Sequence, residues 1–187
     1  DRENIIDDFK TTILPGITHW QHPRFFAYFP ANSSPPSVLA EMLTATLGAQ
    51  CMLWQTSPAA TEMETRMMQW LASMIDLPNK FSGVIQDSAS SATLCALLTA
   101  REKATSWKTN ELGFMTIAKK LIVYTSEEAH SSIEKGAKIA GFGKDNIRFI
   151  PTDNKFIMCA NTLRKEIQSD LDKGFVPTCV VASIGTT

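Results

Sequence analysis

The chain has 187 residues and a formal net charge of −1, which is long enough for one ordinary domain with a real core. Hydrophobic residues make up 44% and charged residues 20% of the sequence, as is typical of a soluble globular protein. The nearly neutral charge gives no indication of a nucleic-acid or membrane-surface partner, and no apolar run approaches the roughly 18 to 20 residues of a membrane span.

The cysteines and the two ends of the chain bear on where the protein works. The cysteines (Cys51, Cys95, Cys159 and Cys179) are far apart and form no CxxC pair, so neither a zinc site nor a disulfide framework is indicated. We expect reduced thiols in a cytoplasmic protein. The sequence starts with neither Met nor a signal peptide and stops directly after an apolar run. We therefore expect both ends to be cuts in a longer protein.

Residues 1–79 are predicted to form a helical segment. Apolar residues at helical spacing from Val38 to Leu47 predict one helix, which Gly48 would end. Ser57 and Pro58 form a typical helix start, and a second apolar row continues to Met74.

Residues 80–187 alternate between short apolar runs and helical patterns, which predicts the first part of a larger α/β domain. The expected strands and helices are, in chain order, strand 83–86, helix 88–103, strand 121–124, helix 131–140, strand 147–150, helix 161–173 and strand 179–184. Such alternation implies a mostly parallel sheet with helices on both faces. Ligands bind such sheets at the carboxyl ends of the strands.

Two segments at those strand ends are candidates for chemistry. Ser88, Ala89 and Ser90 stand between a strand and a helix, where free N–H groups and hydroxyls suit a phosphate; taken alone, the feature is more simply explained by a plain serine N-cap. His130 follows another strand end, where its imidazole would face a ligand by stacking or proton transfer, or would pack at a helix start. Sequence patterns typical of nucleotide P-loops, dinucleotide folds and hydrolase elbows are absent.

Two further segments are weaker candidates. Residues 185–187 (Gly-Thr-Thr) would complete the wall of the same site or simply form a turn after a strand. Residues 22–30 are rich in rings and would line an aromatic substrate pocket, or form an oligomer interface or a core plug.

In their residues and their order along the chain, these motifs resemble those of the aromatic-L-amino-acid decarboxylases, a family that includes the dopa, tyrosine and tryptophan decarboxylases. The resemblance covers the chain from about Ile13 to Thr187. The matching segments are Thr18-His19-Trp20, His22-Pro23, 25–30 (Phe-Phe-Ala-Tyr-Phe-Pro), Trp54, Ser57-Pro58-Ala59, 61–64 (Thr-Glu-Met-Glu), 83–86 (Gly-Val-Ile-Gln), Ser88-Ala89-Ser90, Ala92-Thr93-Leu94, 129–132 (Ala-His-Ser-Ser) and 185–187.

The resemblance implies the type I pyridoxal-phosphate fold, that of the aspartate aminotransferases, in a homodimer with shared active sites, in which residues 1–79 serve in dimerisation. It implies pyridoxal 5′-phosphate as cofactor and an amino acid as substrate. His130 would stack on the cofactor ring and act in catalysis. The implied cofactor-binding residues are Ser88, Ala89, Ser90, His130 and Thr187; the implied substrate-binding residues are Trp20, Tyr28, Phe29, Pro30, Gln50 and Met52.

The chain departs from the family pattern in several places. Asp87 stands where many members have glycine, and Ala31 replaces a hydroxyl-bearing residue. Gln50 and Met52 replace apolar or aromatic residues of the dopa-type members, which bears on substrate choice. The lysine that binds the cofactor, the aspartate at its ring nitrogen and the mobile loop would follow Thr187.

The implied activity is decarboxylation of an L-amino acid, most simply an aromatic one, to the amine and carbon dioxide. The alternatives are a decarboxylase of the same fold for glutamate, histidine or a diamino acid, or an aldehyde-forming relative. A non-catalytic fragment or an apolar binding module is the alternative of another class.

Overall fold

The computed structural model describes residues 2–29 and 33–184. The chain divides into two compact units, Asp1–Met63 and Glu64–Thr187. The predicted division between residues 79 and 80 remains a prediction about the whole protein.

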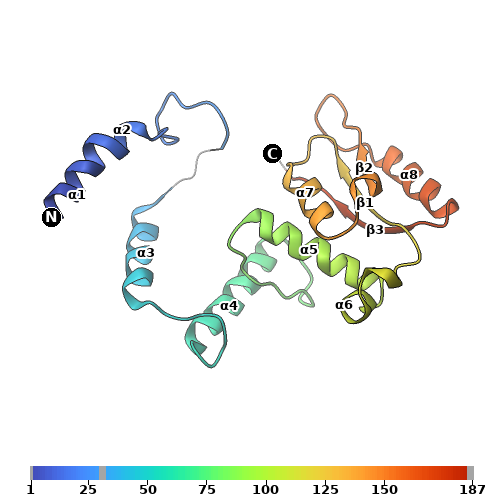
Figure 1. The fold of residues 1–187 in the computed structure, drawn as a ribbon, viewed down its shortest axis with the longest axis horizontal. Coiled ribbons are helices and arrows are strands. Elements are labelled where there is room, and N and C mark those ends of the chain that lie inside the picture. Colours follow the sequence, from blue (N-terminus) through green and yellow to red (C-terminus); the bar gives the residue numbers. More distant parts are fainter. Residues whose placement is uncertain (1, 30–32, 185–187) are drawn as a thin grey trace. The chain divides into compact units, whose positions relative to one another are not determined.

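The first unit is helical, as the sequence predicts for this part. It contains α1 (Arg2–Asp8), the π-helical turn η1 (Phe9–Ile13), α2 (Leu14–Gly16) and α3 (Pro35–Leu47), and α4 (Pro58–Met74) begins in it (Figure 1). Ser34 starts α3 as a capping box in which its hydroxyl accepts the Ser37 N–H. Gly48 ends the helix at φ 56°, a conformation that glycine adopts without steric cost, so the predicted stop is confirmed.

The second unit contains a three-stranded sheet with helices around it. After α4, its elements are α5 (Ala89–Ala104), α6 (Lys108–Leu112), η2 (Phe114–Thr116), β1 (Leu121–Ser126), α7 (Ser132–Ile139), η3 (Lys144–Asn146), β2 (Ile147–Ile150), α8 (Ala160–Asp172) and β3 (Val176–Val181). The strand order is β2-β1-β3, and both pairings of β1 are parallel. The predicted α/β class and parallel sheet are therefore confirmed.

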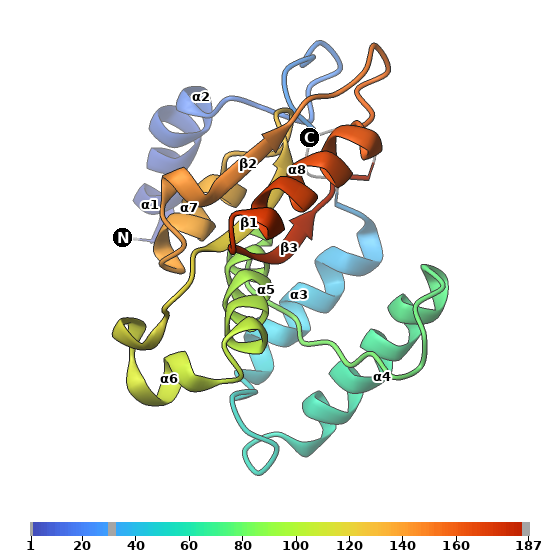
Figure 2. The same cartoon turned by 90° about the vertical axis from the view of Figure 1, so that its right-hand side faces the viewer.

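Helices cover both faces of this sheet, with α8 on one side and α5 and α7 on the other (Figure 2). Leu121 and Val123 of β1 pack with Leu97 of α5 and Ala137 of α7. The alternate residues of the same strand point the other way, where a cluster that includes Tyr124 packs against α8. Because β1 is buried along its whole length, it forms the centre of the core.

The second unit also contains a buried network of charges between β1, β2 and α8. The Tyr124 hydroxyl donates to Asp170 Oδ2 at 3.0 Å. The Arg148 guanidinium donates to both carboxylate oxygens of Asp170, at 3.0 and 2.8 Å. Both Tyr124 and Asp170 are fully buried. Burial disfavours the charged carboxylate, but the hydrogen bonds from Arg148 and Tyr124 outweigh it, so the pKa of Asp170 lies below its ordinary value.

Two of the predicted strands differ from the observed ones. The segment 83–86 is extended but forms no strand within the described structure. A strand exists only where a neighbour accepts its ladder hydrogen bonds, and the Ile85 N–H instead donates to the side chain of Glu64. The last strand is β3, Val176–Val181, earlier than predicted. Pro177 lies inside β3, and because proline has no N–H the pairing with β1 shifts register beside it.

Candidate functional site

The helix α5 begins at Ser88, where the sequence predicts either a phosphate cradle or a plain serine N-cap. Ser88 is the N-cap, and its hydroxyl accepts the Ser91 N–H at 3.2 Å. The N–H groups of Ala89 and Ser90 fall in the first turn, where no carbonyl of the same helix is available to them. These donors and the positive end of the helix dipole favour a bound anion.

A cavity of about 230 Å³ lies between α5 and α7. Its lining residues are Ser90, Ser91 and Leu94 from α5, and Ser132, Lys135, Gly136 and Ile139 from α7. Gly136 lets the helices approach closely, because a Cβ added there would lie 3.1 Å from the Leu97 Cδ1 atom. The first turns of the two helices therefore face the same cavity.

His130 lies just before α7, next to this cavity. Its Nδ1 accepts the backbone N–H of Ser132 at 3.2 Å and lies 2.9 Å from the Ser132 hydroxyl. Because a backbone N–H only donates, Nδ1 carries the lone pair and the proton of the neutral ring is on Nε2. Ser132 also lines the cavity, so it links the imidazole to the α5 cradle. His130 itself is exposed and able to meet a ligand.

The residues present fit a phosphate group. Ser90, Ser91, Ser132 and Lys135 are among the lining residues, and hydroxyl and ammonium groups such as theirs are the usual donors to a phosphate. Asp87 is exposed and is not one of the lining residues, so the carboxylate that departs from the family pattern stays out of the cavity.

Three polar lining residues were not predicted as site residues, namely Ser91, Ser132 and Lys135. Ser91 follows the N-cap Ser88 by three positions, and residues spaced by three share one face of a helix. Applied to the first turn of α5, this rule would have found Ser91. The position of Lys135 at the cavity and the contact of Ser132 with His130 needed the structure.

The predicted substrate-binding residues lie in the first unit. Trp20 stacks on Tyr28 with ring centroids 5.4 Å apart and on Phe25 with centroids 5.2 Å apart. Tyr28 has a φ of 59°, a rare conformation for a bulky residue. Since the cradle belongs to the other unit, the role of this aromatic cluster at the site stays a prediction.

The remaining predicted residues are distributed as follows. Phe29, Gln50 and Met52 are exposed residues of the first unit. Their contribution to a substrate pocket stays a prediction. Pro30 and Thr187 lie outside the described residues.

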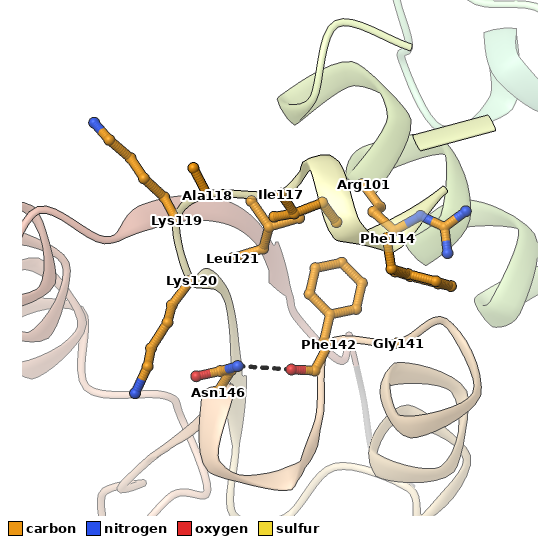
Figure 3. Close-up of a pocket in the computed structure, with 10 residues that line it drawn as sticks. All are labelled: Arg101, Phe114, Ile117, Ala118, Lys119, Lys120, Leu121, Gly141, Phe142 and Asn146. Atoms are coloured by element: carbon orange, nitrogen blue, oxygen red, sulfur yellow. Dashed lines mark hydrogen bonds between the residues drawn. The ribbon is translucent and has the colours of Figure 1, made fainter. Parts of the chain in front are cut away.

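A second cavity, of about 290 Å³, lies at the start of β1 and is a poor candidate for this chemistry. Leu121, Phe142 and Phe114 form much of its wall, and Lys119 and Lys120 point away from it (Figure 3). The Arg101 guanidinium is held by Glu102 and by the Ala140 carbonyl. The guanidinium in its wall is therefore already paired, and the cavity lies at the start of β1, whereas His130 follows the end of that strand.

Residues 2–29 and 33–184 contain no cluster of three or more His, Cys, Asp or Glu side chains able to hold a metal ion. None of the helices formed by these residues combines the length and the apolar character that a bilayer crossing requires.

Comparison with known proteins identifies the family. The model of the pyridoxal-dependent decarboxylase conserved domain matches residues 1–187. The chain is 45% identical to the aromatic-L-amino-acid decarboxylase of Bos taurus over 196 aligned positions, which cover 99% of this chain and 40% of the bovine protein. It is 44% identical to the 4-hydroxyphenylacetaldehyde synthase of Rhodiola rosea, covering 99% of this chain and 38% of that one.

A solved structure gives the same result. The tryptophan decarboxylase of Catharanthus roseus, in complex with L-tryptophan, superimposes with a TM-score of 0.89 at 38% identity, covering 100% of this chain and 40% of that one. The chain thus spans about 40% of the length of relatives such as these. The comparisons confirm the predicted family, fold class and cofactor, pyridoxal phosphate. The chain belongs to the pyridoxal-dependent decarboxylase family.

Proposed function

We propose that the protein decarboxylates an aromatic L-amino acid to the corresponding amine and carbon dioxide with the help of pyridoxal phosphate. The observation that carries this proposal is the single cavity shared by the first turns of α5 and α7, with His130 beside it. The relatives support the aromatic substrate class through their names, an aromatic-L-amino-acid decarboxylase and a tryptophan decarboxylase.

The residues of this chain divide the work in the following way. The pyridoxal ring, when bound, supplies an acceptor for the electrons left by the departing carboxylate. The N–H groups of Ala89 and Ser90 and the nearby serine hydroxyls would hold the phosphate, and Lys135 would add a positive charge. His130 would stack on the ring, with the proton of its neutral imidazole on Nε2 because the Ser132 N–H donates to Nδ1. From the resemblance to the family, Thr187 is proposed to belong to the cofactor site as well.

Substrate choice rests on the residues of the first unit. The cluster of Trp20, Phe25 and Tyr28 presents stacked rings, a surface that favours an aromatic side chain. From the resemblance to the family, Phe29, Pro30, Gln50 and Met52 are proposed to bind the substrate as well. Formation of an aldehyde is the second candidate, since one relative at 44% identity is a 4-hydroxyphenylacetaldehyde synthase.

The assay on the full-length protein combines an absorbance scan with product analysis. We expect a pyridoxal band near the visible edge and release of carbon dioxide with dopa, tyrosine or tryptophan, together with the amine. Release of carbon dioxide from glutamate alone would leave the fold assignment intact and overturn the proposed substrate class. An aldehyde in place of the amine would establish the second candidate. If no band forms, the chain is part of a non-catalytic protein or a binding module.

The protein is proposed to work as a homodimer with shared active sites. None of the α3 residues is buried, and Leu39, Met42, Leu43 and Leu47 are each more than half exposed, at 61 to 76%. Ile5 and Ile13 near the start of the chain are also exposed. Apolar rows of this extent mark an interface, and a second copy of the chain is the partner proposed.

Sedimentation of the full-length protein tests this assembly. A dimer is expected at micromolar concentration, and Leu43→Glu should shift the equilibrium toward the monomer, because a charge on an apolar contact opposes burial. Glu41→Lys on the same helix serves as the control for a changed surface charge. A wild-type protein that sediments as a monomer would refute the dimer.

A cytoplasmic location is proposed as well. Its support is that all four cysteines are free thiols, with Cys51 and Cys95 exposed. Burial raises the pKa of Cys179 to about 11, so this thiol stays protonated and unreactive at neutral pH.

A further inference from the structure

The carboxylate of Glu64 on α4 accepts a hydrogen bond from the backbone N–H of Ile85 at 2.6 Å. The two residues are 21 positions apart, and Glu64 is half-buried. Hydrogen bonds to an ionised acceptor are short and about twice as strong as neutral ones. This contact therefore fixes the extended segment that leads from α4 to the start of α5.

The same segment is held at two neighbouring positions. Gly83 lies against Met68 of α4 so closely that an added Cβ would be 3.0 Å from the methionine sulfur. On the other side, the Gln86 side-chain oxygen accepts from the Cys95 thiol of α5 at 3.5 Å. The segment is thus in contact with both α4 and α5. Ser88, which caps α5, follows Ile85 by three residues.

The geometry points to Glu64 as a positioning residue for the phosphate-binding turn, an inference that rests on the proposed function. Glu64 does not belong to the lining of the α5–α7 cavity. It acts through the backbone of Ile85, which sets where the chain enters α5 and hence where the N–H groups of Ala89 and Ser90 point. Without the carboxylate, the Ile85 N–H loses its partner, and the segment 83–86 loses its only charged contact with α4 among those described above.

A comparison of two ligands on the full-length protein tests this role. The apoprotein is titrated with pyridoxal 5′-phosphate and with pyridoxal, which lacks the phosphate, and the two Kd values are read from the absorbance change. Glu64→Ala is expected to weaken binding of the phosphorylated ligand about 10-fold, the effect of one ordinary charged hydrogen bond, and to leave the Kd of pyridoxal unchanged. Glu64→Gln should restore most of the affinity, because the amide oxygen still accepts.

Two further variants separate positioning from general damage. Ile85→Pro removes the N–H donor and keeps the carboxylate, so it should reproduce the loss of phosphate-dependent affinity seen with Glu64→Ala. If Glu64→Ala does not fold, Ile85→Pro tests the positioning role in its place. Glu62→Ala, on the same helix, removes an exposed carboxylate whose contact is with the Trp54 indole. It should leave both Kd values near those of the wild type.

The outcomes are distinct. A selective loss of affinity for the phosphorylated ligand supports the inference. Equal weakening of both ligands, or no change in either, overturns it while leaving the proposed function intact. If the wild-type protein binds neither ligand, the proposed function itself fails and this inference fails with it.

Discussion

Replacement of His130 by alanine in the full-length protein is expected to lower kcat on the order of 100-fold, the cost of losing the group that orients a reacting ring. The side chain is exposed and contributes nothing to the core, so the fold should be kept. Its contacts are with Ser132, through Nδ1. Steady-state rates of carbon dioxide release measure the effect, and circular dichroism checks the fold.

Two partial variants separate the functions of this imidazole. His130→Phe keeps a flat ring without nitrogen atoms, so cofactor binding should persist while turnover falls. Ser132→Ala removes the hydroxyl beside Nδ1 but keeps the backbone donor, so we expect a smaller loss, of about 10-fold or less. His19→Ala, at an exposed histidine of the first unit, is the control. Near-wild-type turnover by His130→Ala would rule out its assignment to the ring face.

The order of elements in the second unit could be predicted from the sequence because local signals agree there. Helical spacing, serine caps and glycine stops all favour the same helices, so the predictions for α5, α7 and α8 lie within one or two residues of the observed bounds. The prediction of a strand at 83–86 was wrong for a physical reason. Its apolar residues satisfy a strand pattern, but pairing depends on a neighbour that the pattern does not specify.

The candidate site was predicted only where its residues follow the end of a predicted strand. The Ser88-to-Ser90 turn and His130 could be placed by the rule for parallel sheets. Lys135 and Glu64 could not be connected to the site in this way, because their relevance comes from contacts between helices. Lys135 reaches the cavity only because Gly136 allows α7 to approach α5, and Glu64 meets Ile85 across a separation of 21 residues.

The same limit applies to the buried charge network. In sequence, Asp170 is one of several acidic residues on a polar helix, and nothing distinguishes it from the exposed Asp172. Its partners, Tyr124 and Arg148, come from β1 and β2, so the network exists only after α8 packs on the sheet. Because a fully buried carboxylate needs such partners, the network makes the position of α8 specific.

Asp170→Ala is expected to lower the free energy of unfolding by about 3 kcal/mol at pH 7, the lower end of the range for breaking a buried ion pair. The lower end applies because the Arg148 side chain is 22% exposed and regains water when its partner is lost. Urea denaturation of the full-length protein, followed by circular dichroism, measures the change. Asp172→Ala on the same helix, which removes only an exposed contact with Gln168, is expected to cost less than about 1 kcal/mol.

The dependence of this difference on pH tests its electrostatic origin. The pKa of Asp170 is lowered in the folded protein, so ionisation stabilises the fold at every pH above the ordinary aspartate value of about 3.9. That contribution is lost as the pH falls below this value toward the folded pKa. The gap between wild type and Asp170→Ala should therefore be constant from about pH 5 to 8 and shrink in stronger acid. A gap that stays the same at about pH 3 would mean that lost packing, and not the bond to Arg148, accounts for the destabilisation.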